Sequence, residues 1–324
     1  MVRPALASKS SPLTEALRLL PPWLREAFAP VPESERAGVE EIRINQARPL
    51  MARSGRADWF VTPEGFSESE ENAFLPTERQ VLEVLDALTS SSVYALDEAM
   101  RCGFLPMPGG HRAGLVGEVR MDGGRVQGFR YVTGFNIRLS RAVEGPGASL
   151  LPHLRKAGGS VWSTLVLSPP GCGKTTLLRE LIRLLGRGDA RAGVRPHRVG
   201  VADERSELAG CFRGVPQLDV GPRVDVIDGA PKRFALSMLI RTMSPEVVVT
   251  DELGHPGDAE AVLDAVGAGV TLLCSAHGSS VEELAARPTL RPLFEAGVFH
   301  RAVVLSRRRG PGTIERIVAG RLGG

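Results

Sequence analysis

A glycine-containing loop between two apolar segments has the residue types needed to hold a phosphate group. Residues 168–175 read Ser-Pro-Pro-Gly-Cys-Gly-Lys-Thr, after a strand-like run and before a helix-like run with leucines on one side. Glycines let successive backbone N–H groups wrap a phosphate, and a helix N-terminus adds the positive end of its dipole. The pattern predicts a Walker A loop, in which Lys174 contacts the β- and γ-phosphates of ATP and the Thr175 hydroxyl binds Mg²⁺.

The predicted nucleotide contacts extend over the whole turn of this loop. The residues expected to bind the nucleotide are Pro170, Gly171, Cys172, Gly173, Lys174, Thr175 and Thr176. Cys172 is expected to act through its backbone N–H group. Ser168 stands where the motif has its first glycine, so the match departs from the pattern there. An accidental glycine turn is disfavoured because the flanking segments are those that the motif requires.

Two adjacent carboxylates end another apolar run and could complete a metal-dependent site. Residues 247–250 are β-prone, and Asp251 and Glu252 follow directly. Walker B acids occupy this position, where Asp251 would hold Mg²⁺ through water and Glu252 would polarise the attacking water. An Asp-Glu pair alone is a weak signal, but together with the Walker A loop it predicts ATP hydrolysis.

Two further polar clusters lie in the same half of the chain. Residues 203–207 read Asp-Glu-Arg-Ser-Glu, and His277 ends the segment 272–277. Ligands gather at the carboxyl ends of the strands of an open parallel sheet, so both clusters are expected to converge on the nucleotide. We predict catalytic roles for Glu204 and His277. Two alternatives remain open: an ion pair in a loop, and a loop histidine with satisfied hydrogen bonds.

A repeating pattern of strands and helices must position these residues. From Val161 onward, apolar runs alternate with helical segments; the runs cover residues 165–167, 199–201, 247–249, 270–274 and 302–305. Continuous apolar character indicates strands buried on both faces, as in the parallel sheet of an α/β domain. The predicted fold class is therefore α/β, with a P-loop ATPase domain and a mainly parallel sheet over residues 146–324.

The first half of the chain has a different pattern, which predicts a smaller α+β domain over residues 1–145. Residues 77–80 form a capping-box sequence ahead of a helical apolar pattern. A flexible linker is expected at 144–147. The other predicted elements are a short helix at 94–101, a hairpin turn at 122–124, and strands at 41–44, 59–61, 104–107, 113–121, 126–132 and 135–139.

Length, composition and charge argue against several classes of protein. A chain of 324 residues is long enough for two domains, and its four widely spaced cysteines predict neither a zinc site nor a disulfide framework and fit a reducing cytosol. We expect neither a membrane span nor an export signal, because no sufficiently long apolar run is present. The net charge of +3 and 5% aromatic content give little support for nucleic-acid binding, and the arginines at 307–309 are interpreted as a solvated hairpin or tail.

The order of these motifs resembles a known class of ATPases. Walker A loop, acidic cluster, Walker B and histidine follow one another as in the type II/IV secretion ATPases, and segments 241–252 and 275–280 resemble parts of those motors. Over about residues 40–315 the chain is also similar to the stage III sporulation protein AA family, although Ser168 and Ser275 depart from the usual pattern. The residues that carry this similarity are Gly103-Phe104, the segment 108–112, Gly114, Gly117 and the segments 136–138, 203–207 and 251–254.

The resemblance implies a fold, partners and a location that composition and spacing do not show. It implies a RecA-like ATPase domain and a ring-like homo-oligomer, a hexamer, that energises a secretion-like channel during endospore formation. The protein would lie in the cytoplasm of the mother cell, at the cytoplasmic face of the membrane, with membrane-embedded channel subunits as partners. Arg241 is predicted to be a catalytic residue that orders the Walker B strand within its own subunit.

Other classes of function also use a P-loop. A nucleic-acid-binding P-loop ATPase is the main alternative, and a small-molecule kinase is disfavoured because no acceptor site or lid is recognisable. In P-loop motors, an arginine from a neighbouring subunit commonly stabilises charge on the γ-phosphate. Arg112 and Arg138 are candidates for this role, with a surface or ion-pairing role as the alternative.

Overall fold

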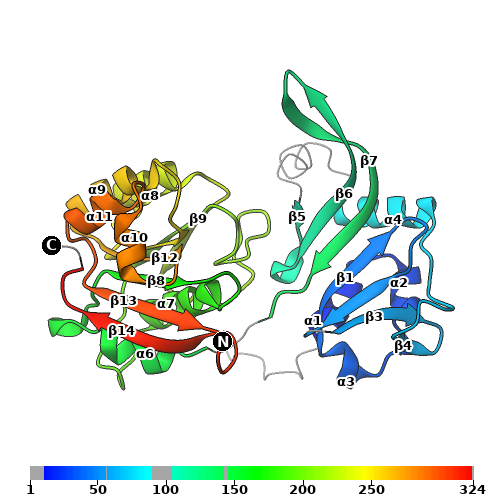
Figure 1. Cartoon of the computed structure of the whole chain (residues 1–324), viewed down its shortest axis with the longest axis horizontal. Coiled ribbons are helices and arrows are strands. Elements are labelled where there is room, and N and C mark those ends of the chain that lie inside the picture. Colours follow the sequence, from blue (N-terminus) through cyan, green and yellow to red (C-terminus); the bar gives the residue numbers. More distant parts are fainter. Residues whose placement is uncertain (1–10, 56, 90–103, 142–144, 323–324) are drawn as a thin grey trace, which may run out of the picture. The chain divides into compact units, whose positions relative to one another are not determined.

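The computed structural model describes residues 11–55, 57–89, 104–141 and 145–322, and the helix predicted at 94–101 lies outside them. The chain divides into two compact units, Met1–Arg141 and Ala142–Gly324, each with its own seven-stranded sheet (Figure 1). The sequence predicted a boundary a few residues later. Gly147, from the predicted linker, donates its N–H to Glu180 Oε2 at 2.8 Å, so this residue packs within the second unit.

The first unit is an antiparallel sheet with short helices. Its strands lie in the order β4-β3-β2-β1-β7-β6-β5. Thr77 and Gln80 exchange hydrogen bonds at the start of α4, which confirms the predicted capping box. The elements are α1 (Pro12–Leu17), α2 (Pro22–Ala27), α3 (Glu33–Arg36), β1 (Val39–Asn45), β2 (Met51–Ser54), β3 (Ala57–Thr62), β4 (Gly65–Ser67), α4 (Glu78–Thr89), β5 (Phe104–Pro106), the short 3₁₀ turn η1 (Pro108–Gly110), β6 (Arg112–Asp122) and β7 (Arg125–Arg138).

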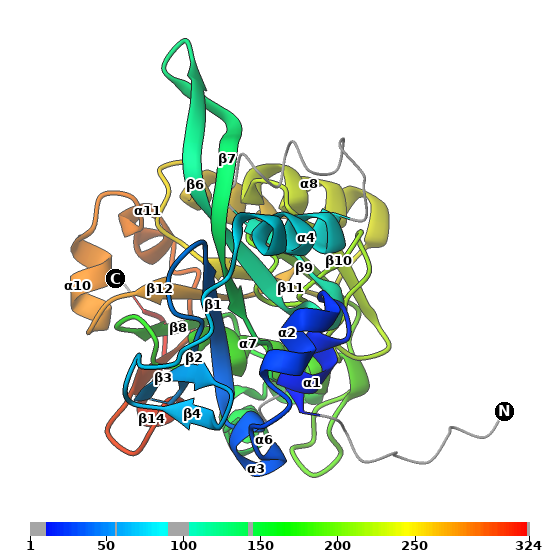
Figure 2. The same ribbon diagram turned by 90° about the vertical axis from the view of Figure 1, so that its right-hand side faces the viewer.

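Strands β6 and β7 form a long hairpin that extends beyond the other strands of its sheet (Figure 2). The predicted turn is confirmed, with Gly123 and Gly124 at φ values of 52° and 75°. The sequence predicted two strands, 126–132 and 135–139, where the structure has one. Gly134 lies between them because a Cβ there would lie 2.5 Å from the carbonyl oxygen of Ile44 on β1. This glycine permits close packing and does not end the strand.

The second unit is a mainly parallel sheet with helices on both faces, which confirms the predicted α/β class (Figure 1). Its strands lie in the order β10-β9-β11-β12-β8-β13-β14, and β14 runs antiparallel to β13. No described helix is long and apolar enough to cross a membrane. The elements are α6 (Gly147–Leu154), the 3₁₀ turn η2 (Ala157–Gly159), β8 (Thr164–Ser168), α7 (Lys174–Arg187), β9 (Val199–Asp203), β10 (Val224–Asp228), α8 (Lys232–Met243), β11 (Val247–Glu252), α9 (Asp258–Gly267), β12 (Thr271–His277), α10 (Val281–Ala286), α11 (Arg291–Glu295), β13 (Arg301–Ser306) and β14 (Thr313–Ala319).

A hydrophobic core on each face holds this sheet in place. Val166 of β8 packs with residues of α6 and α7, whereas its neighbours Leu165 and Leu167 pack with residues of α8, α9 and α11. Strands β10 and β14 were not predicted, because they are only partly buried and their apolar residues are interrupted by charged ones. Since β8, β9, β11 and β12 run parallel, their carboxyl ends meet at one edge of the sheet.

Candidate active site

The glycine loop joins β8 to α7 in the order that the sequence predicted. Strand β8 ends at Ser168, and α7 begins at Lys174 with Gly173 as its N-cap residue at φ 90°. Gly171 has a φ of 68°, a left-handed conformation that favours glycine. Ser168 has no positive φ, so its backbone does not require the glycine usual in the motif. The loop therefore has the curled backbone of a phosphate-binding loop.

The connection between β13 and β14 contacts the carbonyl groups of this loop. Arg307 Nε donates to the carbonyl oxygen of Gly171, and the Gly312 N–H donates to that of Cys172, each at 2.8 Å. A Cβ on Gly173 would lie 2.9 Å from the Gly312 nitrogen, so this hairpin also requires a glycine there. The arginines at 307–309 do lie in a hairpin, but sequence analysis missed this contact because it joins residues 136 positions apart.

Lys174 is buried among uncharged hydrogen-bond acceptors. Its Nζ donates to the Ser168 carbonyl and hydroxyl oxygens at 3.1 and 3.3 Å, to the Pro169 carbonyl oxygen at 3.3 Å, and to His277 Nδ1 at 2.9 Å. Burial lowers the pKa of Lys174, while the nearby charge of Glu252 acts to raise it. A buried ammonium with neutral contacts attracts an anion strongly, because its charge is weakly screened there.

His277 connects Lys174 to Glu252. Its Nδ1 accepts from the Lys174 ammonium, so the ring proton lies on Nε2, which is 3.0 Å from Glu252 Oε2. About two fifths of each of the His277 and Glu252 side chains is exposed, so solvent reaches this pair. The structure thus brings together three residues that the sequence placed on separate motifs.

Asp251 and Glu252 end β11 at a β-bulge. The pairing of β11 with β12 shifts register between Thr250 and Glu252, which interrupts the usual alternation of side chains. Asp251 is buried, and burial raises its pKa to about 6 although Lys232 acts to lower it. Asp251 Oδ1 is 3.2 Å from Lys232 Nζ, but this ion pair lacks the alignment of a hydrogen bond. That buried oxygen retains the capacity to accept a hydrogen bond from a metal-bound water.

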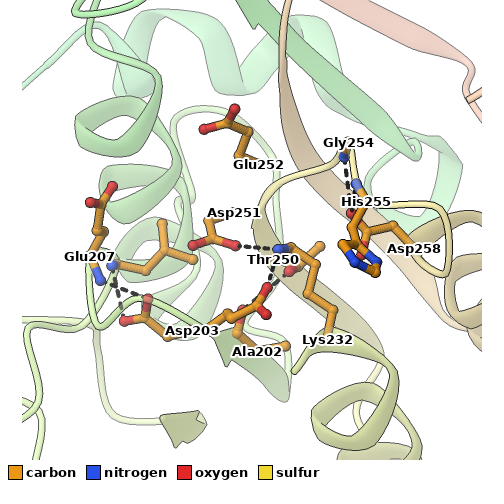
Figure 3. A network of polar contacts seen from close by, with 12 residues as sticks. Ala202, Asp203, Glu207, Lys232, Thr250, Asp251, Glu252, Gly254, His255 and Asp258 are labelled. Atoms are coloured by element: carbon orange, nitrogen blue, oxygen red, sulfur yellow. Dashed lines mark hydrogen bonds and ion pairs between the residues drawn. The ribbon is translucent and has the colours of Figure 1, made fainter. Parts of the chain in front are cut away.

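Lys232, which sequence analysis did not select, lies beside Asp251 (Figure 3) and also contacts the predicted site carboxylate Glu204. Its Nζ is 2.5 Å from Glu204 Oε2 as well as 3.2 Å from Asp251 Oδ1. Burial acts to lower the pKa of Lys232, but the bond to Glu204 and the charges of Asp251 and Asp258 outweigh it and raise the pKa. One sequence signal could have identified this residue. Nearly all of the 40 basic residues are arginine, so each of the few lysines stands out.

The residues of the predicted acidic cluster have two different roles: one shapes the loop after β9, and another contacts the candidate site. The Asp203 carboxylate accepts the backbone N–H groups of Glu207 at 2.7 Å, Leu208 at 3.0 Å and Ala209 at 2.8 Å (Figure 3). These bonds shape the loop after β9. Glu204, in the same loop, reaches Lys232. Asp203 therefore shapes the loop, whereas the loop ion pair that the sequence left open as an alternative is the one between Glu204 and Lys232.

A cavity of about 390 Å³ lies beside these carboxylates. Residues that line it include Glu204, Lys232, Asp251, Glu252 and Asp258. Asp258, at the start of α9, is itself buried and accepts two backbone N–H groups from the loop before it. The cavity is therefore rich in carboxylates and contains one buried ammonium.

The structure does not bring Arg241 to the other site residues. Arg241 lies exposed in the last turn of α8, nine residues after Lys232. At a rise of about 1.5 Å per residue, the two backbones are roughly 14 Å apart along the helix. Helix α8 connects parallel strands, so its C-terminal end lies at the edge of the sheet opposite the glycine loop. Within its own chain, Arg241 is not positioned to act on the nucleotide that Lys174 would hold.

The two arginines considered for a neighbouring copy lie side by side in the first unit. Arg112 on β6 is paired with Arg138 on β7. The Arg112 guanidinium lies 5.5 Å from the Phe104 ring centroid, and Arg138 Nε lies 3.9 Å from Glu41 Oε2. Arg138 is three-quarters exposed, so most of its guanidinium remains accessible.

The donor groups at this edge of the sheet fit a nucleotide with a divalent metal. The curled loop and Lys174 match phosphate oxygens, which need N–H and ammonium donors. Thr175 lies half-buried in the first turn of α7, and Asp251 offers a buried carboxylate oxygen, both suitable for Mg²⁺ or its bound water. Glu252 is accessible to solvent, and its Oε2 lies 3.0 Å from an imidazole nitrogen, an arrangement that suits a residue accepting a proton from water.

The chain is similar in sequence to a sporulation protein, and in fold to a pilus retraction motor and to an ATPase. Residues 16–322 match the family model for sporulation stage III, protein AA. The chain is 40% identical over 306 residues to stage III sporulation protein AA of Bacillus subtilis (strain 168), with 94% of each chain covered. Its fold is similar to the pilus retraction motor PilT with bound ADP, at a TM-score of 0.55 and 12% identity over 89% of this chain and 81% of that chain. The Legionella pneumophila ATPase DotB gives a TM-score of 0.50 and 12% identity over 93% and 78%.

Proposed function

The chain belongs to the sporulation stage III, protein AA family, and on this premise we propose that it is a magnesium-dependent ATPase motor. One observation carries the proposal most directly. Among the described residues, the hydrogen-bond partners of the buried Lys174 ammonium at the glycine loop are all neutral groups, and one of them, His277, also lies 3.0 Å from Glu252. This arrangement offers a cation for phosphate and a carboxylate for water within one site.

Each site residue has one task in this proposal. Lys174 and the loop N–H groups bind the β- and γ-phosphates. Mg²⁺, held by Thr175 and through water by Asp251, supplies neutralisation of charge on the phosphate oxygens. Glu252 orients the attacking water and accepts its proton. His277 contacts both Lys174 and Glu252, so it fixes the positions of these two side chains relative to each other.

The family and the fold likeness support the proposed motor role. A sporulation family and a fold shared with a pilus motor fit an ATPase that drives a secretion-like channel during endospore formation. We expect a ring of identical copies, a hexamer, in the mother-cell cytoplasm at the face of the membrane. Its partners would be the membrane-embedded subunits of the channel.

In such a ring, an arginine of the neighbouring copy would complete the site. Such arginines stabilise the charge that develops on the γ-phosphate. Arg112 and Arg138 are the two candidates, because Arg138 is accessible and the two are neighbours in one sheet. If either acts in this way, its alanine variant should bind ATP yet hydrolyse it slowly. Mixing that variant with Lys174→Ala should restore part of the activity.

Hydrolysis and mass measured together test the proposal. Purified protein should release phosphate from ATP only when Mg²⁺ is present, and turnover per chain should rise with protein concentration as rings form. Light scattering should show a larger mass with ATP than without it. A monomer whose turnover per chain does not change with concentration would contradict the ring. Binding of single-stranded DNA at low salt, lost as salt is added, would support a nucleic-acid-binding ATPase instead.

A further inference from the structure

Lys232 occupies a position that helix stability does not explain. It is the first residue of α8, after the N-cap residue Pro231. The N-terminal end of a helix carries partial positive charge, so a lysine there is disfavoured. Only 7% of Lys232 is exposed, which makes an uncompensated charge more unfavourable still. Something other than α8 must hold this ammonium.

Carboxylates supply that compensation. Glu204 and Asp251 approach the ammonium from two different strand ends, at 2.5 and 3.2 Å. Asp258 adds a third negative charge nearby. The ammonium is therefore the counter-ion of carboxylates that end β11, follow β9 and begin α9.

The chemistry of the site explains why this cation is a lysine. Nearly all of the 40 basic residues of the chain are arginine, yet Lys232 and Lys174 are both buried lysines at the first residue of a helix. A guanidinium is planar and carries five donors in a wide fork, whereas an ammonium is a compact point charge. Contacts of 2.5 and 3.2 Å to two carboxylates suit the compact group.

The same ammonium accounts for the lack of a formed metal site. Four carboxylates line one cavity, yet the described part of the chain contains no group of three or more His, Cys, Asp or Glu residues placed to hold a metal ion. Two of these carboxylates are directed at Lys232 instead. A divalent cation at this position would have to displace the ammonium or meet its repulsion.

We propose that Lys232 is a resident cation of the Walker B pocket, which prevents Mg²⁺ from binding there before the nucleotide arrives. The inference rests on the proposed role of Asp251 toward Mg²⁺. The ammonium neutralises Glu204 and Asp251 while the site is empty of nucleotide. Phosphate oxygens of the bound nucleotide then supply the additional negative charge that the metal needs. Lys232 is thus a positioning residue that makes metal binding depend on nucleotide binding.

Manganese binding to nucleotide-free protein tests this role. The full-length chain would be titrated with Mn²⁺, followed by electron paramagnetic resonance of the free ion. Wild-type protein should show no binding below millimolar Mn²⁺, and Lys232→Met should bind Mn²⁺ roughly tenfold tighter or more, because a compensating charge has been removed from an acidic pocket. Lys232→Arg retains the charge and should exclude Mn²⁺ as the wild type does.

Matched controls separate this role from a structural one. Lys156→Met removes a lysine that lies on the Trp162 ring of the same unit, and it should leave Mn²⁺ binding unchanged. A folded Lys232→Met protein that binds Mn²⁺ no better than wild type would overturn the inference. Submillimolar Mn²⁺ binding by nucleotide-free wild type would overturn it without any variant. Loss of Mg²⁺-dependent ADP binding in Asp251→Asn is a separate test of the premise, so failure of the inference and failure of the proposed function can be told apart.

Discussion

Two lysines at one edge of the parallel sheet are equally buried, but one contacts neutral groups and the other contacts carboxylates. Lys174 and Lys232 are each the first residue of a helix, and each is 7% exposed. Lys174 donates to carbonyl and hydroxyl oxygens and to an imidazole, whereas Lys232 contacts two carboxylates. The first ammonium is therefore available to an incoming anion, and the second is already neutralised.

The direction of each pKa shift reflects this difference. Burial lowers the pKa of Lys174, and its neutral contacts do not reverse that effect. Burial acts in the same direction on Lys232, but the carboxylates outweigh it and raise the pKa. Equal burial with opposite outcomes shows that the partners decide what a buried charge can do. A phosphate bound at the glycine loop would give Lys174 the compensation that Lys232 has already.

The largest effect is expected from removing the uncompensated lysine. Lys174→Ala should weaken ADP binding about 10- to 100-fold, because hydrogen bonds to charged groups contribute about 1.5–3 kcal/mol each. Its ATP turnover should fall by about 1000-fold. Calorimetric titration with ADP and a phosphate-release assay would measure the two effects. Lys156→Ala is the matched control, and unchanged ADP affinity in Lys174→Ala would place the phosphate site elsewhere.

A slightly smaller loss, confined to turnover, is expected at Glu252. Glu252→Gln keeps the shape of the side chain but cannot take up a proton from water, so turnover should fall about 100-fold or more. ADP affinity should stay within about threefold of wild type, because no phosphate contact is removed. Single-turnover hydrolysis separates the two quantities. A parallel loss of affinity would make Glu252 a binding residue.

An intermediate loss of turnover is expected at His277, the histidine that contacts both Lys174 and Glu252. His277→Ala removes the contact to Lys174 and the one to Glu252, so turnover should fall by about tenfold while ADP affinity changes less. His153→Ala, at an exposed position on α6, is the control. Turnover equal to that of the control would mean that His277 is only a loop histidine with satisfied bonds.

The smallest effect is expected at Glu246, a carboxylate away from the site. It extends the comparison of the two lysines to a partly buried carboxylate whose pKa is also set by its partner. The half-exposed Arg195 holds the pKa of Glu246 down at about 2. A lowered pKa means that the pair stabilises the fold above the unfolded pKa of about 4.5 and that this stability is lost as pH falls toward 2. Glu246→Gln should therefore lower the free energy of unfolding by about 0.5–1 kcal/mol at pH 7.

Urea denaturation at several pH values would measure this difference. The gap between wild type and Glu246→Gln should close between about pH 4.5 and 2, where Glu246 becomes protonated in both folded and unfolded chains. Turnover per folded molecule should stay unchanged at pH 7, since Glu246 precedes β11 at the end opposite Asp251. A large loss of turnover would mean that both edges of the sheet serve the site.

Sequence alone predicted the parts of this site that are local in the chain. The glycine loop, the carboxylates that end β11 and the histidine that ends β12 each follow an apolar run within a few residues, so strand ends could be located and expected to meet. Lys232 could not be found in this way, because its contact with Glu204 spans 28 residues and depends on the order of strands in the sheet. Arg241 lies at the other edge of the sheet because helix direction decides which edge a residue reaches, and its predicted ordering of the Walker B strand stays a prediction.

The fold, too, was predictable where the signal is local in the sequence and not where it depends on distant contacts. Buried strands such as β8 and β11 were predicted because burial on both faces leaves a continuous apolar run. Edge strands β10 and β14, and the short β2 and β4, lack that signal because much of their surface meets solvent. The sequence predicted two strands, 126–132 and 135–139, where Gly134 instead lets β1 approach one continuous strand β7.

The bonds from Arg307 and Gly312 to the glycine loop have a consequence for the thermodynamics of nucleotide exchange. A phosphate-binding loop that is disordered when empty must lose conformational entropy each time a ligand binds. Here the carbonyl groups of Gly171 and Cys172 accept hydrogen bonds from the β13–β14 hairpin, and these bonds involve protein groups alone. These bonds preorganise the loop, so under the proposed function the release of ADP would not require its collapse. Repeated cycles of exchange would then proceed on a loop that keeps one shape.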